Sequence, residues 1–272
     1  MSLGMVSLSI KAFDEINLYY KKDLIDNPKA VILISHGLAE HCQRYDYVTN
    51  KLNNLGYNVY RYDHRGHGLS DGKRGHLSDV NNLVNDANTI LELIKSENPN
   101  SPIFLLGQDV GGHTFLEYGC QYKDSVQGII LCSPLVCDTL GLTKTDESLT
   151  DILTPIPYNN THNLTHDTVM QNSYENDPLI LNKITLGMYK SLRESCLNII
   201  DDLYKFKFPC LILHDSSDST VSHNDSKFLF DNILSRDKDI RILNGLYHRL
   251  LDEIVKDEII EEISKWIEKR LS

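Results

Sequence analysis

The 272-residue sequence predicts an α/β fold in which a mostly parallel, doubly wound sheet carries helices on both faces. Three observations support this prediction. Short runs of continuous apolar residues recur along the chain, stretches with helical spacing separate them, and Gly- or Asp-rich turns follow them. A strand that is covered on both faces is apolar throughout, and alternation of such strands with helices is typical of parallel sheets.

The first half of the chain supplies most of these elements. Residues 6–10 and 16–20 are expected to form a leading hairpin, and buried strands are expected at 30–35, 57–62 and 103–106. Helices are expected at 45–55, where Gly56 closes the last turn, and at 83–97. The second of these is predicted by six apolar residues at helical spacing: Leu83, Val84, Ala87, Ile90, Leu91 and Ile94.

The second half interrupts the alternation. A helix at 114–121, strands at 127–132, 211–213 and 240–243, and an amphipathic closing helix at 252–271 are expected. Between them, roughly 137–194 has no strand pattern and turns helical from about Lys183. We interpret 137–194 as a cap or lid inserted over a core formed by 5–136 and 195–272.

Composition excludes some functions. The formal net charge of −11 argues against a nucleic-acid partner, because such proteins carry a basic footprint. No apolar run approaches the roughly 20 residues that span a bilayer, and the N-terminus lacks a signal-peptide pattern. The six scattered cysteines are expected to be reduced thiols, so the sequence predicts a cytoplasmic protein.

The stretch from Gly107 to Gly112 contains the sharpest signal. An apolar run enters a Gly-x-x-x-Gly turn and then a helical stretch. This is the frame of a nucleophile elbow, in which one side chain is held on a strand-to-helix turn above a sheet. The side chain at its apex is Asp109, where serine is usual.

Two later residues complete a catalytic set in chain order. A nucleophile needs an imidazole to move its proton and a carboxylate to orient that imidazole, and in this fold they follow in the order nucleophile, acid, histidine. Asp218 follows a predicted strand, with Asp215 as a rival, and His248 follows the next strand. Carboxyl ends of strands are where open α/β sheets place their sites.

A further run, 35–41, ends a central strand and predicts an oxyanion site. The backbone N–H groups of Leu38 and Val110 are expected to converge on a developing negative oxygen.

Together these motifs resemble the monoacylglycerol lipase and lysophospholipase family of α/β-hydrolases. The matching runs are 35–41 with Arg44 and Tyr45, 63–72, the elbow frame, 132–134, and 247–253. The resemblance covers the chain except the cap, which looks short. It implies the α/β-hydrolase fold, cleavage of a small lipid-like monoacyl ester without a cofactor or metal, Asp218 and His248 as acid and base, and Leu38 and Val110 as oxyanion donors.

Asp109 departs from the family's serine, and three interpretations stay open. In the first, which we favour, the protein belongs to the esterase family with an altered nucleophile. A carboxylate that attacks an ester gives an anhydride, and its charge repels the oxyanion, so ester hydrolysis should be weak or absent. In the third, the pocket only binds a lipid-like ligand, and Asp109 caps the helix that follows it.

In the second interpretation Asp109 is a nucleophile of the epoxide hydrolase or haloalkane dehalogenase kind. A carboxylate can displace at a saturated carbon, and His248 would then activate water to cleave the alkyl ester. Gln108 adds to this likeness. Against it, Val110 stands where those families carry tryptophan, and 35–41 contains no proline. Tyr158, Tyr174 and Tyr189 of the cap are available to bind a leaving oxygen.

Other features have simpler interpretations. His113 is expected to be a partly exposed packing residue, and His64 and His67 to shape their loop through hydrogen bonds. His162 and His166 would bind a metal only on a helix, so no metal site is expected. The apolar cluster at 149–156 is interpreted as a core-facing cap helix, with peripheral contact to a membrane as the alternative.

Overall fold

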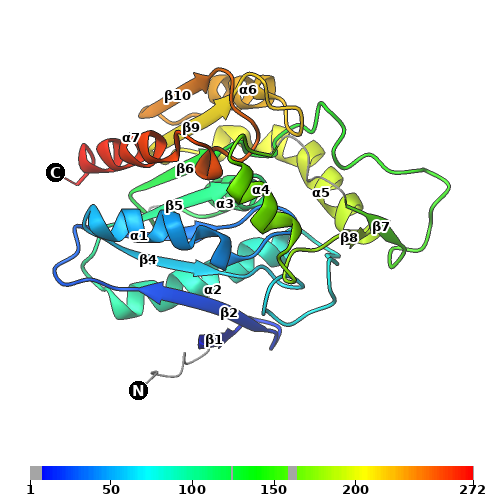
Figure 1. The fold of residues 1–272 in the computed structure, drawn as a ribbon, viewed down its shortest axis with the longest axis horizontal. Coiled ribbons are helices and arrows are strands. Elements are labelled where there is room, and N and C mark those ends of the chain that lie inside the picture. The colour runs from blue at the N-terminus through cyan, green and yellow to red at the C-terminus, as the bar shows by residue number, and fades with distance from the viewer. Residues whose placement is uncertain (1–7, 124, 159–163, 272) are drawn as a thin grey trace.

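A computed structural model describes residues 8–123, 125–158 and 164–271 of the chain. Its centre is a sheet of eight strands in the order β1-β2-β4-β3-β5-β6-β9-β10 (Figure 1). The strands are β1 (Leu8–Lys11), β2 (Asn17–Asp23), β3 (Ala30–Ser35), β4 (Tyr57–Tyr62), β5 (Ile103–Gln108), β6 (Gly128–Cys132), β9 (Cys210–Asp215) and β10 (Lys238–Leu243).

The pairing confirms the predicted mostly parallel sheet. From β4 through to β10 every neighbouring pair is parallel, and only the edge pairs β1–β2 and β2–β4 are antiparallel. The predicted leading hairpin is therefore present, apart from residues 6 and 7, which lie outside the described part. All residues of β3, β5, β6 and β9 are buried, as their apolar runs predict. All residues of β4 are buried too, including Asn58 and Arg61.

Helices cover both faces of this sheet. Helices α1 (Asp46–Asn54) and α7 (Lys256–Glu268) pack on one face, where Val48, Leu52 and Ile263 join the apolar core. Helices α2 (Asn81–Glu97), α3 (Val110–Gln121) and α6 (His223–Asn232) pack on the other. No helix of the described residues is long and apolar enough to cross a membrane.

Three local expectations differ from the structure. Helix α3 begins at Val110, directly after the elbow, and not at Thr114. Helix α6 was not predicted, because its residues are mostly polar and only one side of it meets the core. The closing helix α7 is shorter than the predicted 252–271, since 250–252 forms a separate 3-10 turn, η3 (Leu250–Asp252).

The cap region between β6 and β9 also corrects the sequence prediction. It contains two short strands, β7 (Pro155–Pro157) and β8 (Lys183–Thr185), paired antiparallel, where no strand was expected. Helix α4 (Thr168–Glu175) precedes β8, and helix α5 (Leu186–Asn198) follows it. The expected core-facing helix at 149–156 is absent, and Ile152 and Leu153 are exposed. The boundaries of the cap, 137–194, stay a prediction.

The contact between Gly128 and Trp266 gives a test of how α7 docks on the sheet. A Cβ on Gly128 would lie 2.7 Å from the Trp266 ring, in a closely packed core. We expect Gly128→Ala to lower the free energy of unfolding by about 1–3 kcal/mol, the usual cost of overpacking. Urea unfolding measures this, and Trp266, the one tryptophan of the chain, reports the disturbance by its fluorescence.

A double-mutant cycle with Trp266→Leu is the control. The smaller side chain removes the clash, so the alanine should cost far less in that background. Equal costs in both backgrounds would show that the ring does not limit position 128.

Candidate active site

The apex of the site is Asp109, the residue that joins β5 to α3. Its backbone has φ 52° and ψ −115°, a left-handed conformation that costs a non-glycine residue about 1–3 kcal/mol. The flanking glycines are required because a Cβ on Gly111 would lie 2.2 Å from the Ser35 carbonyl oxygen, and a Cβ on Gly107 would lie 2.5 Å from the Gly111 carbonyl oxygen. The turn therefore has the geometry of a nucleophile elbow.

The carboxylate of Asp109 points back toward the run that follows β3. Its Oδ2 accepts a hydrogen bond from the Leu38 backbone N–H at 2.9 Å. Gly37 leaves the space for this contact, since a Cβ there would lie 3.2 Å from Oδ2. Oδ1 is buried without a hydrogen-bond partner among the described residues. The side chain does not cap α3, contrary to the expectation attached to the binding-protein interpretation.

His248 and Asp218 face this apex from two later loops. The Nδ1 atom of His248 lies 2.7 Å from Asp218 Oδ2, and its Nε2 atom lies 3.9 Å from Asp109 Oδ1. The other oxygen of Asp218 accepts hydrogen bonds from the backbone N–H groups of Thr220 at 2.8 Å and Val221 at 3.1 Å. Asp218 is thus fixed, and it in turn orients the imidazole toward Asp109.

Burial and charge set the protonation of this trio. Burial opposes the charged form of His248, but the carboxylate and hydrogen bond of Asp218, with the charge of Asp109, raise its pKa to about 9. Burial also works against the charged form of Asp218, yet His248 and His214 hold the pKa of Asp218 below its usual range. For Asp109, burial outweighs the nearby imidazole and the N–H groups of Leu38 and Val110, so its pKa is raised.

The structure brings all five predicted site residues together: Asp109, Asp218, His248, Leu38 and Val110. All five are buried, and Asp109 and His248 are each only 3% exposed. The cap residues Tyr158 and Tyr189 belong to the same buried cluster as Leu38 and Val110. The rival Asp215 does not join them. Its Oδ1 accepts the Ser217 backbone N–H at the end of β9.

Two supports of His248 were missed from the sequence. Gln108 donates from Nε2 to the His248 carbonyl oxygen at 3.2 Å, and His214 Nε2 lies 3.1 Å from Asp218 Oδ2. His214 stands four residues before Asp218 in the sequence, and Gln108 adjoins the apex, so their positions were the available signal. Neither position in the sequence is enough to predict that the side chain contacts Asp218 or the His248 loop.

A buried ion pair joins the histidine loop to the oxyanion run. Arg249, next to His248, pairs with Glu40, two residues beyond Leu38, and its Nε lies 2.6 Å from Asp252 Oδ2. Tyr174 of α4 lies between the guanidinium groups of Arg249 and Arg44, each 5.3 Å from its ring centre. These contacts attach the cap helix α4 to the site. The sequence runs that contain Glu40, Arg44 and Arg249 were noted, but their pairing was not.

The remaining histidines that the sequence drew attention to have structural roles. His64 Nε2 contacts Ser35 Oγ at 3.1 Å and the His36 carbonyl oxygen at 3.0 Å, which confirms that it shapes its loop. His113 is fully buried and not partly exposed as expected. His166 lies 3.1 Å from Glu253, and His162 lies outside the described residues.

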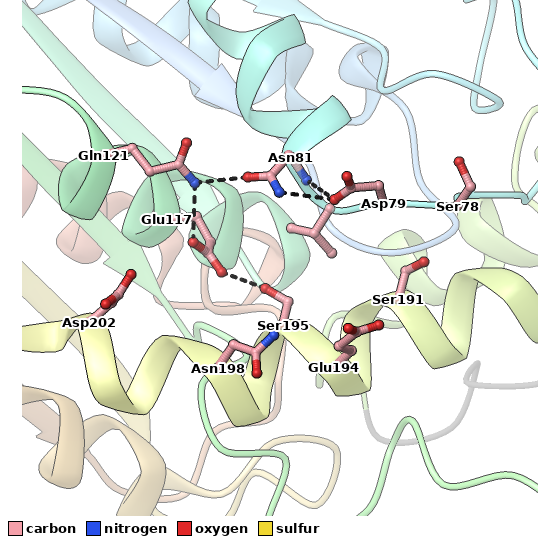
Figure 2. A pocket seen from close by; sticks show the side chains of 11 residues that line it. Ser78, Asp79, Asn81, Glu117, Gln121, Ser191, Glu194, Ser195, Asn198 and Asp202 are labelled. Carbon is pink, nitrogen blue, oxygen red and sulfur yellow. Dashed lines mark hydrogen bonds between the residues drawn. The ribbon is translucent and has the colours of Figure 1, made fainter.

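A separate cavity of about 470 Å³ lies between α3, α5 and residues 78–81, away from the apex (Figure 2). Its lining is polar and acidic, with Asp79, Glu117, Glu194 and Asp202, and none of the five predicted site residues lines it.

The sheet order, the strained apex and the hydrogen-bonded pair of Asp218 and His248 define the class of protein as an α/β-hydrolase. The hydrolase family described as serine aminopeptidase, S33, matches residues 26–254, and the chain belongs to this family. Within it the chain is a monoacylglycerol lipase-like α/β-hydrolase, as the sequence motifs predict.

Similar proteins agree in length and in fold. A monoacylglycerol lipase of Mycolicibacterium smegmatis is 28% identical over 252 residues, which cover 90% of each chain. A monoglyceride lipase homolog of Monkeypox virus is 30% identical and covers 91% of this chain and 92% of its own. The crystal structure of the Paleococcus ferrophilus monoacylglycerol lipase superposes with a TM-score of 0.80 at 26% identity, over 93% of this chain and 99% of that one.

The charge of Asp109 makes a prediction about His248. Asp109→Asn removes a negative charge beside the imidazole, so the pKa of His248 should fall from about 9, and Asp218→Asn should lower it further because Asp218 contributes more. Histidine NMR titration measures both. His76, whose pKa is lowered by burial and by Lys73, should keep its titration in either variant.

The raised pKa of His248 makes the free energy of unfolding depend on pH. A histidine whose folded pKa is about 9, against an ordinary 6.5, stabilises the fold fully below pH 6.5 and loses this contribution as the pH rises through 9. Urea unfolding should therefore show stability falling across that window, and less so in Asp109→Asn. An unchanged slope in the variant would contradict the coupling.

Proposed function

We propose that this protein is a carboxylic-ester hydrolase of the monoacylglycerol lipase or lysophospholipase type with an altered nucleophile, weak or inactive on esters as it stands. Asp218 and His248 are the acid and base, and the N–H groups of Leu38 and Val110 are the oxyanion donors. The substrate class is a small lipid-like monoacyl ester, since the similar proteins named above are monoacylglycerol lipases.

One observation carries the proposal. Asp109 Oδ2 accepts the Leu38 N–H at 2.9 Å and so occupies the place that an ester's developing oxyanion would need. Donors of this kind accelerate acyl transfer only when the transition-state oxygen can reach them. With the carboxylate there, the negative charge of Asp109 beside a protonated His248 resembles the oxyanion and imidazolium of that transition state. An ester substrate therefore cannot place its own oxygen at the same position.

The test is Asp109→Ser. A serine is short enough to leave the Leu38 N–H free, and His248 can take its proton. We expect kcat/KM for p-nitrophenyl esters to rise at least ~10³-fold over the parent, the scale that a missing nucleophile costs in hydrolases of this chemistry.

Asp109→Ser combined with His248→Gln is the matched control and should return the rate toward that of the parent. A parent that already hydrolyses these esters as fast as Asp109→Ser would contradict the altered-nucleophile proposal.

A second candidate, a hydrolase with Asp109 as nucleophile, is favoured by the other oxygen of the same side chain. Oδ1 is unpartnered among the described residues and faces His248 Nε2 at 3.9 Å. Oδ1 would attack a saturated carbon of an epoxide or haloalkane, and that carbon's bond to oxygen or halide would break. A halide would leave as the anion, and an opened epoxide oxygen would take a proton from a cap tyrosine, which regains it from solvent. Tyr158 and Tyr189, which pack with Leu38 and Val110, line the side from which such a substrate would come.

The second step follows from charge. Esterification removes the negative charge of Asp109, so the pKa of His248 falls and the neutral imidazole can take a proton from water. The hydroxide so formed attacks Cγ while the Leu38 and Val110 N–H groups hold Oδ2. On collapse the leaving oxygen takes the proton from His248 and departs as the alcohol, and the new carboxylic acid loses its proton to solvent, which restores the carboxylate.

This candidate predicts a covalent adduct. After incubation with a styrene-oxide-type epoxide or a haloalkane, intact mass spectrometry should find one alkyl group on Asp109, and His248→Gln should accumulate it. Asp109→Asn should acquire none. No adduct on either the parent or His248→Gln would exclude the candidate, and a lipid-induced rise in Tm without turnover would then favour a binding protein.

Peripheral contact of the cap with a membrane also stays a proposal. It is supported by the exposed apolar side chains of Leu140, Ile152 and Leu153.

A further inference from the structure

His113, in the first turn of α3, supports the strained apex. Its backbone N–H donates to the Asp109 carbonyl oxygen at 2.9 Å, and its side-chain Nδ1 lies 2.8 Å from the Leu135 carbonyl oxygen. The Leu135 N–H donates back to the Asp109 carbonyl oxygen at 3.3 Å. One buried imidazole thus holds the loop after β6 against the elbow, whose left-handed backbone persists only where neighbours fix it.

The other end of the same imidazole reaches the cap. Nε2 lies 2.7 Å from the hydroxyl of Ser195, on cap helix α5, and this hydroxyl is hydrogen-bonded to Glu117 of α3. Figure 2 shows the Ser195–Glu117 contact at the wall of the 470 Å³ cavity. A chain of His113, Ser195 and Glu117 therefore runs from beneath the elbow, through α5, to a surface cavity.

Counting protons shows what keeps this chain intact. Nδ1 must carry a proton to bond the Leu135 carbonyl oxygen, and the Ser195 hydroxyl has one proton to give. The two contacts of Ser195 need two protons between them, so either Nε2 or Glu117 must carry one more. Without this additional proton, the Ser195 hydroxyl donates a hydrogen bond to only one of its two neighbours. Its contact with the other neighbour then brings two acceptors together with no proton between them.

We infer that His113 is a positioning residue for the elbow, and that the His113–Ser195–Glu117 chain is a latch that docks helix α5 while it holds one exchangeable proton. The inference rests on the proposed function only in taking Asp109 as the reacting position. When that proton is absent, one of the two hydrogen bonds of Ser195 is lost and α5 is held less firmly.

The cavity beside this chain of contacts is acidic. Asp79, Glu194 and Asp202 line the same cavity, and no Lys, Arg or His is among its lining residues. Gln121 donates to the free oxygen of Glu117 at 3.4 Å. Other titratable groups packed near α3 and α5 include His76, Cys120, Cys137, Asp138, Cys196, Lys205 and Asp225.

Hydrogen exchange of the full-length protein tests the latch. Peptides covering 186–198 are followed at pH 5, 7 and 9, after correction for intrinsic exchange rates. Protection in the parent should fall about fivefold from pH 5 to pH 9, the factor that one ordinary hydrogen bond contributes. Ser195→Ala should show the low protection at every pH.

Glu117→Gln distinguishes a proton latch from simple packing. Its amide can donate to Ser195 while Ser195 donates to neutral His113, so the chain closes without the extra proton. We expect protection to stay high from pH 5 to pH 9. Ser191→Ala is the matched control, because that hydroxyl lies on the same helix and cavity but donates to the Leu77 carbonyl oxygen at 3.2 Å; it should keep the parental pH dependence.

Two outcomes would overturn the inference: a parent without pH dependence, or Glu117→Gln with the same dependence as the parent, which would assign the effect to His76 or another group. No substrate is used, so the result is independent of whether Asp109→Ser gains esterase activity. Peptides covering 133–136 should lose protection in His113→Leu but not in Ser195→Ala, since only the first removes the bond to Leu135.

Discussion

The site depends on how a buried carboxylate at a strained turn is compensated. Asp109 has little contact with solvent, and its charge is met by the Leu38 N–H on one side and the His248 imidazole on the other. A buried charge without such partners would be expelled or protonated. The turn, the oxyanion run and the histidine loop must therefore stay in register. The paired strands β3 and β5 hold the oxyanion run beside the turn, and β10 of the same sheet leads into the histidine loop.

A second set of buried charges preserves that register. Arg249 and Glu40 tie the residue after His248 to the run that contains Leu38, and Gln108 holds the His248 carbonyl oxygen. Because Tyr174 lies between Arg249 and Arg44, the cap helix α4 shares this network. The cap is thus connected to the site on two sides, through α4 at the ion pairs and through α5 at His113.

The sequence predicts what depends on local patterns. Continuous apolar runs place β3 and β6 to within a residue, because a strand covered on both faces is mostly apolar. Strand β4 is also placed to within a residue, although buried Asn58 and Arg61 interrupt its apolar residues. Asp218 and His248 follow from their positions after strands, and the geometry brings them together. The short strands β7 and β8 escape prediction because three residues are too few to show a periodicity, and β7 also contains two prolines. Helix α6 escapes because its surface is polar.

Contacts between distant segments could not be predicted from one chain. Nothing local to His113 distinguishes a packing residue from one that contacts Ser195, 82 positions away. The same holds for the preference of His248 for Asp218 over Asp215, which depends on where the turn after β9 directs each side chain. The direction of the Asp109 carboxylate likewise depends on the space left by Gly37.

Four loops supply the parts of the site: one carries the apex, a second the acid, a third the imidazole, and a fourth most of the N–H donors. Each loop follows its own strand of the sheet. Replacing the apex side chain leaves the other three loops in place. A scaffold built in this way separates the shape of the pocket from the reaction carried out inside it, so relatives can keep the same ligand while they lose, regain or exchange their chemistry at a single position.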